Sequence, residues 1–110
     1  MEDRRQHSRR TTELQLEVFD LNTTQRLGRV VDLSTDGFML FSETPPQVDS
    51  VIECCLTPAA PIDGIREVIL GADCLWTRPA ADNLHHWAGF HIIDLAEEHA
   101  EALKALLKRL

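Results

Sequence analysis

The chain has no long apolar run and little cysteine. No stretch of its 110 residues approaches the roughly 18 to 20 apolar residues that a membrane-spanning helix requires. The first ten residues also lack the apolar segment of a secretory signal. We therefore expect a cytoplasmic protein without membrane insertion. The three cysteines include the adjacent Cys54 and Cys55 and form no CxxC motif, which disfavours a disulfide scaffold and a zinc knuckle.

Catalytic and metal-binding patterns are also missing. His85 and His86 are adjacent, and adjacent strand residues point to opposite faces, so the pair does not easily share a metal ion. No carboxylates have the paired spacing of a general acid and base, and no serine lies in a nucleophile elbow. The sequence therefore predicts no enzyme activity, no metal site and no cofactor.

The net charge of −7 is distributed unevenly along the chain. The first ten residues carry four arginines against two carboxylates, whereas the remaining hundred carry seven basic and sixteen acidic side chains. A general nucleic-acid binder needs basic surface along a long stretch of backbone, so this acidic body disfavours a nucleic-acid polymer as partner. A compact anion with few phosphates, held by one arginine cluster, fits the charge distribution better.

The rest of the chain has the composition of one ordinary globular domain, with 44% hydrophobic and 26% charged residues. Alternating polarity, β-branched residues and breaks at glycine or proline predict six short strands. They cover residues 13–19, 26–33, 38–41, 51–56, 65–76 and 86–93. Gly71, inside the longest of them, suggests a bulge or bend. The connecting turns are too short for crossover helices, which indicates an all-β antiparallel barrel or sandwich.

The final segment, residues 96–110, has a different period. Its apolar residues recur at steps of three and four, which predicts one apolar face of a helix. Glu97 and Glu98 lie near the positive start of this helix and basic residues lie near its negative end. We expect the helix to cover one opening or face of the barrel, capped by Asp94 or a neighbour. The chain thus divides into an arginine-rich arm, residues 1–12, and a barrel with its closing helix, residues 13–110.

Four arginines of the arm form the first candidate site: Arg4, Arg5, Arg9 and Arg10. Such a cluster is self-repelling unless an anion lies within it. A guanidinium group donates two parallel hydrogen bonds to a phosphate, or to O6 and N7 of guanine. Arg5 and Arg9, four residues apart, are therefore expected to clamp one anion from two sides.

The second candidate site is the polar break Asp32-Leu33-Ser34-Thr35-Asp36-Gly37, between two predicted strands. A carboxylate such as Asp32 accepts hydrogen bonds from N1 and N2 of guanine, which an arginine cannot do, and Ser34 suits base or phosphate. Gly37 allows either a positive φ or a close backbone approach. Donors on the arm and acceptors on the turn would then recognise one base from two edges.

RxxxR near the N-terminus followed by DxSxxG resembles the PilZ domain family over essentially the whole chain. The segments Cys74-Leu75-Trp76 and Trp87-Ala88-Gly89-Phe90, followed by an amphipathic helix, are similar to the family pattern too. The resemblance implies a six-stranded antiparallel β-barrel with a C-terminal α-helix. It also implies a receptor for the bacterial second messenger cyclic di-GMP. Five residues match the two motifs by position: Arg5, Arg9, Asp32, Ser34 and Gly37.

Three further residues complete the candidate ligand-binding set. Arg4 precedes the motif as an additional arginine, a variation that in similar proteins accompanies a stacked pair of ligands. Arg10 follows the motif directly. Trp76 either stacks on a guanine or packs in the core or rim of the barrel.

The leading hypothesis is a single-domain cyclic di-GMP receptor. Ligand binding would order the arm and so change a surface that an unidentified protein partner recognises. The main alternative is a PilZ-like protein–protein interaction module that does not bind nucleotide. An oligonucleotide-binding barrel is disfavoured by the acidic body and by the few aromatic residues, and a small enzyme lacks candidate residues.

Overall fold

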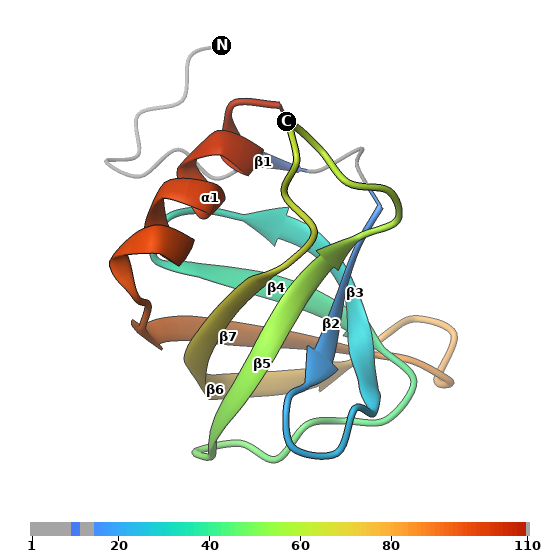
Figure 1. Ribbon diagram of the computed structural model, residues 1–110. Coiled ribbons are helices and arrows are strands. Elements are labelled where there is room, and N and C mark those ends of the chain that lie inside the picture. Colours follow the sequence, from blue (N-terminus) through green and yellow to red (C-terminus); the bar gives the residue numbers. More distant parts are fainter. Residues whose placement is uncertain (1–9, 12–14, 110) are drawn as a thin grey trace, which may run out of the picture.

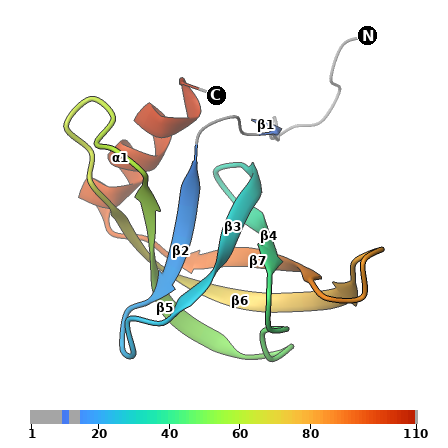
Figure 2. The ribbon, with the colours of Figure 1, turned by 90° about the vertical axis from the view of Figure 1, so that its right-hand side faces the viewer.

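The computed structural model describes residues 10–11 and 15–109. The strands and the helix follow one another in this order: β1 (Arg10–Thr11), β2 (Leu16–Asp20), β3 (Arg26–Leu33), β4 (Gly37–Ser42), β5 (Val51–Pro58), β6 (Val68–Pro79), β7 (His86–Asp94) and α1 (Glu97–Leu107). Strands β2 to β7 pair antiparallel in the order β3-β2-β5-β6-β7-β4, and a further pairing of β3 with β4 closes them into a six-stranded barrel. The fold expected from the sequence is therefore confirmed. Figures 1 and 2 show α1 and the short β1 at the same end of this barrel.

The six long strands lie close to their predicted places. The fifth barrel strand shows the largest difference, because β6 starts at Val68 and reaches Pro79, whereas the sequence predicts residues 65–76. Ile65 instead forms an isolated bridge with Ile62. The irregularity expected at Gly71 is confirmed by a register shift between Gly71 and Ala72 against β7. Strand β1 is not predicted from the sequence, since two residues are too short for a periodic pattern.

The barrel interior is filled by the apolar residues that alternate along each strand. In β2, Leu16 and Val18 are fully buried, and in β4 the same holds for Leu40. Helix α1 adds Leu103 and Leu106 to this core. Each such leucine contributes roughly 2 kcal/mol through burial of its side chain. The helix therefore closes one end of the barrel by continuing the core.

The ends of α1 differ from the expected ones in detail. The helix begins at Glu97, after Ala96 as N-cap, and no side-chain hydrogen bond caps it, so the expected cap at Asp94 is wrong. The two glutamates of its first turn and Lys104 in its last turn match the helix dipole as expected. After the helix, the Arg109 guanidinium pairs with both carboxylate oxygens of Asp63, at 2.8 and 2.5 Å. This ion pair ties the end of α1 to the loop between β5 and β6.

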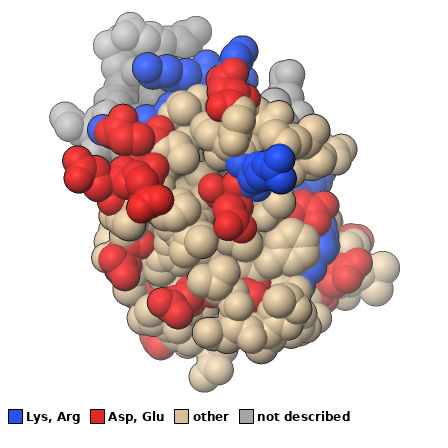
Figure 3. Space-filling view, in the orientation of Figure 1, with Lys and Arg blue, Asp and Glu red and all other residues tan. Residues whose placement is uncertain are grey.

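Within the described part of the chain, no helix is both long and apolar enough to cross a membrane. On the face shown in Figure 3, acidic side chains gather over α1 and basic ones lie near its far end.

Candidate ligand-binding site on the outer face of the barrel

The Asp32–Gly37 segment forms a tight turn between β3 and β4 that is fixed by the Ser34 hydroxyl. Ser34 Oγ accepts hydrogen bonds from the N–H groups of Asp36, at 3.2 Å, and Gly37, at 3.3 Å. The same hydroxyl donates to the Gly37 carbonyl at 3.3 Å, and the Ser34 N–H donates to it at 2.9 Å. Ser34 is only 2% exposed. Its side chain therefore holds the shape of the turn from inside.

Gly37 is required by close packing of backbones. A Cβ at this position would overlap the carbonyl oxygen of Phe90 on the neighbouring β7. Of the two reasons that the sequence left open, the close approach applies, because the single positive-φ glycine among the described residues is Gly64. The Ile92 N–H also donates to the Asp36 carbonyl at 2.7 Å. The turn is thus packed directly against β7.

Asp32 reaches the outer face of the barrel because of a bulge in β3. Val30 pairs with Leu40 and Asp32 pairs with Met39, so Val31 is an extra residue between them. Val30 is 2% exposed and faces the core. In a regular strand Asp32 would share that inner face, since side chains alternate. The bulge turns the carboxylate outward instead.

Trp76 is turned outward in the same way. Cys74 pairs with Phe90 and Trp76 pairs with Gly89, which leaves Leu75 as the extra residue of β6. Cys74 is fully buried, whereas Trp76 is half-buried on the outer face. A Cβ on Gly89 would overlap the indole ring, so the ring lies directly over this glycine.

The two bulges place Asp32 and Trp76 in one row across four strands. Successive register partners are Asp32 of β3, Met39 of β4, Gly89 of β7 and Trp76 of β6. We call these four residues the site row. Met39 and Gly89 are not predicted as site residues from the sequence, because the pattern of a single strand does not reveal which residues face each other across strands.

The start of the chain joins the site row through β1. Thr11 pairs with Asp32, and Arg10 pairs with Leu33, in antiparallel register. The backbone that follows the RxxxR motif therefore runs beside the DxSxxG turn. The side chain of Arg10 lies outside the described part of the structure, and so do Arg4, Arg5 and Arg9.

A scan of protein-family models matches residues 3–109 to the PilZ domain. This chain belongs to the PilZ domain family. PilZ domains form a family of cyclic di-GMP receptors and are generally non-catalytic. A search of curated proteins gives no match.

Solved structures with the same fold include other PilZ proteins. MotI/DgrA, the inhibitor of motility of Bacillus subtilis, superposes with a TM-score of 0.73 at 14% identity over 97% of this chain and 51% of its own. The PilZ domain of YcgR from Escherichia coli, a structure with c-di-GMP, gives a TM-score of 0.66 at 15% identity over 98% and 92%. The PilZ domain of CeSA from a cellulose-synthesizing bacterium gives 0.60 at 18% identity over 90% and 93%. This chain thus spans about half of MotI/DgrA.

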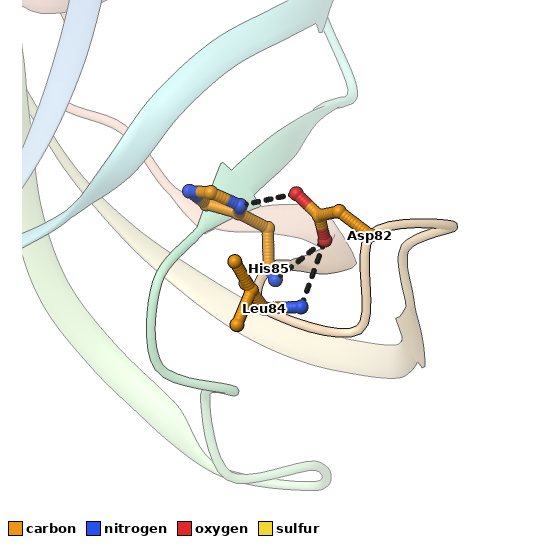
Figure 4. Close-up of polar contacts among 3 residues, drawn as sticks. All are labelled: Asp82, Leu84 and His85. Carbon is orange, nitrogen blue, oxygen red and sulfur yellow. Dashed lines mark hydrogen bonds and ion pairs between the residues drawn. The ribbon is translucent and has the colours of Figure 1, made fainter.

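One carboxylate–imidazole pair lies outside the site row of this PilZ domain, in the hairpin between β6 and β7. Figure 4 shows Asp82 accepting hydrogen bonds from the N–H groups of Leu84, at 2.8 Å, and His85, at 3.0 Å, and contacting His85 Nδ1 at 2.6 Å. The Leu84 N–H above all, and then His85, lower the pKa of Asp82 to about 2. The His85 ring stacks on Phe41 at 4.5 Å. These contacts hold the hairpin between β6 and β7 in its conformation.

The cysteines of the PilZ barrel are free thiols inside it. Burial, followed by the neighbouring Cys55 and Asp20, raises the pKa of Cys54 to about 12, so it carries no thiolate near neutral pH. Over residues 10–11 and 15–109 no group of three or more histidine, cysteine or acidic side chains is arranged to hold a metal ion.

Proposed function

We propose that this PilZ domain is a single-domain cyclic di-GMP receptor that binds its ligand between the RxxxR arm and the DxSxxG turn. The pairing of β1 with β3 is the observation that carries the proposal. It sets Thr11 opposite Asp32 and Arg10 opposite Leu33, beside the turn. In the sequence, Arg9 immediately precedes β1 and Arg5 lies five residues before its first residue, Arg10.

Each motif residue has a distinct task in this proposal. Arg5 and Arg9 donate paired hydrogen bonds to phosphate or to O6 and N7 of guanine, and Arg4 and Arg10 add positive charge around the same anion. Asp32 accepts from guanine N1 and N2 on the outer face of the barrel.

The turn and the tryptophan complete the proposed site. Ser34 acts mainly by holding the turn, since its hydroxyl already bonds to Asp36 and Gly37. Gly37 lets that turn lie against β7. Trp76 lies at the far end of the site row with the Arg78 guanidinium over its ring. A base that takes the place of this guanidinium would gain roughly 1 to 3 kcal/mol from stacking.

In this proposal the arm, residues 1–12, carries the signal. Fixing a backbone costs roughly 1 to 2 kcal/mol per residue, and each bidentate contact of an arginine with guanine returns roughly 1 to 3 kcal/mol. We infer that the bound ligand orders the arm across the turn. The resulting change of surface is then recognised by a protein partner.

Titration calorimetry of the full chain with cyclic di-GMP tests this function. Wild type should bind saturably, and Arg9→Ala should weaken binding roughly 5- to 150-fold. Arg66→Ala is the matched control, because Arg66 is exposed in the loop between β5 and β6, away from the site row. It should bind like wild type.

Three other results would contradict the proposal. Absence of heat with wild type favours the interaction module without nucleotide. Equal binding by Arg9→Ala and Arg66→Ala removes the arm from the site. Salt-sensitive binding of any single-stranded oligonucleotide favours a nucleic-acid-binding barrel.

A further inference from the structure

A second row of residues crosses the same outer face, next to the site row. Arg29 of β3, Phe41 of β4, Trp87 of β7 and Arg78 of β6 are successive register partners. We call these four residues the aromatic row. On β4, β7 and β6 it lies two residues along the strand from the site row, which corresponds to about 7 Å. Its two arginines are exposed and its two aromatic side chains are half-buried.

The rings of the aromatic row are already covered by other side chains. Phe41 stacks with His85 at 4.5 Å and contacts Trp87 at 4.7 Å in a tilted arrangement. The Arg29 guanidinium lies 5.9 Å from the centre of the Phe41 ring. A planar base would have to displace one of these partners in order to stack. The row is therefore poorly suited to a nucleotide.

Its arginines are well suited to carboxylates. The Arg78 guanidinium lies 5.3 Å from the centre of the Trp76 ring, as Arg29 does near Phe41. A guanidinium over a ring uses its flat face for that contact, and its N–H groups in the plane stay available for a bidentate carboxylate. Because the ring restrains the side chain, less conformational entropy is lost when it binds.

Neither arginine has an acidic partner in the part of the chain that the structure describes. The neighbouring Arg26, by contrast, pairs with Glu17 at 2.8 Å. Outside the first ten residues, acidic side chains outnumber basic ones by sixteen to seven. Two arginines that flank an aromatic surface in so acidic a chain make this face complementary to an acidic partner.

We propose that the aromatic row is the docking surface for an extended acidic segment of a protein partner. The backbones of Arg29 and Arg78 are three strand-to-strand steps apart, about 14 Å along the barrel wall. Carboxylates at positions i and i+4 of an extended segment are about 13 Å apart and point to the same side, with position i+2 between them. The segment thus presents two carboxylates to the two arginines and one apolar side chain to Phe41 and Trp87.

The acidic start of α1 in a second copy of the chain does not match this spacing. The acidic start of α1 offers Glu97 and Glu101, but four helical residues span only about 6 Å. That distance is too short to reach both arginines. The docking surface adjoins the proposed cyclic di-GMP site, because the Arg78 guanidinium lies over the ring of Trp76 in the site row.

An NMR titration of the uniformly ¹⁵N-labelled full chain tests the proposal. The probe is the end-blocked peptide SETLTES, and the matched control peptide is SQTLTQS, which has the same length but lacks the carboxylates. SETLTES should shift the amide signals around Phe41 and Trp87 saturably. Two exposed ion pairs predict that SQTLTQS binds roughly two- to thirtyfold more weakly.

Protein variants provide the second comparison. Arg29→Gln combined with Arg78→Gln should lose the same roughly two- to thirtyfold in affinity for SETLTES. Both side chains are exposed, so the fold should persist. Arg66→Gln, another exposed arginine, should bind like wild type.

Three outcomes would overturn the docking surface. The first is no saturable shift with SETLTES, and the second is equal binding of both peptides. The third is concentration-dependent shifts of the aromatic row in the absence of peptide, which would make a second copy its occupant.

Discussion

The β3–β4 turn and the β6–β7 hairpin are each fixed by a side chain that accepts hydrogen bonds from backbone N–H groups. The side chain is buried in the turn and exposed in the hairpin. Ser34 uses a neutral hydroxyl in a buried turn packed against β7. Asp82 uses a carboxylate in an exposed hairpin. Exposed donors regain water when their acceptor is removed, whereas buried donors do not. The turn of the candidate ligand site is therefore a rigid part of the barrel, whereas the hairpin is held by hydrogen bonds within itself.

The largest effect is expected at Gly37. The new methyl group of Gly37→Ala would overlap the Phe90 carbonyl, so the turn must move away from β7. We expect a loss of about 3 kcal/mol in the free energy of unfolding, measured by urea denaturation. Gly71→Ala is the control, because its new methyl group would lie 3.2 Å from the Asp94 Cβ, a contact that requires a shift of only a few tenths of an ångström. Equal losses for the two variants would show that the turn is not rigid.

Ser34→Ala should have the next largest effect. It removes the acceptor of the buried Gly37 N–H and of the partly buried Asp36 N–H, with an expected loss of about 2 kcal/mol. Affinity for cyclic di-GMP should fall as well, since the turn loosens. The same substitution at Ser50, whose hydroxyl donates to the Gln47 carbonyl in another loop, should change stability by less than about 0.5 kcal/mol.

Asp82→Asn should lower the melting temperature less than Ser34→Ala does. The amide keeps an oxygen for the N–H groups of Leu84 and His85 but loses the charge next to the His85 ring. Hydrogen exchange should accelerate at these two amides and stay unchanged in the β3–β4 turn. A larger drop for Asp82→Asn than for Ser34→Ala would reverse the comparison.

The smallest effect is the pH dependence of the hairpin. The folded-state pKa of Asp82 is lowered from 3.8 to about 2, so its stabilising contribution is fully present above pH 3.8 and disappears as the pH falls through about 2. The difference in melting temperature between wild type and Asp82→Asn should therefore shrink across this interval. A constant difference would mean that the charge of Asp82 contributes nothing.

The sequence predicted the barrel well where a strand follows its simple alternation. Residues 26–33 match β3, and the break before Gly37 matches the turn, because the polar residues there cannot continue an apolar strand. The terminal helix was equally clear from its period of three and four.

The outer face was much less predictable. Val30, Val31 and Asp32 look like one continuous strand, and nothing in them reveals that Val31 is the extra residue of a bulge. The same applies to Leu75 before Trp76. Bulges arise from the closure of the whole barrel, which depends on strands far apart in the sequence. The DxSxxG segment could thus be found as a motif, but its neighbours Met39 and Gly89 could not.

The bulge at Val31 has a consequence for transplanting this motif into other proteins. Side chains along a strand alternate between the two faces of the sheet. One additional residue therefore moves every later side chain of that strand to the opposite face. A designer who grafted DxSxxG onto a regular strand would point its aspartate into the apolar interior of the host barrel. A transplanted segment that keeps the aspartate on the outer face must therefore start one residue before the motif, at Val31.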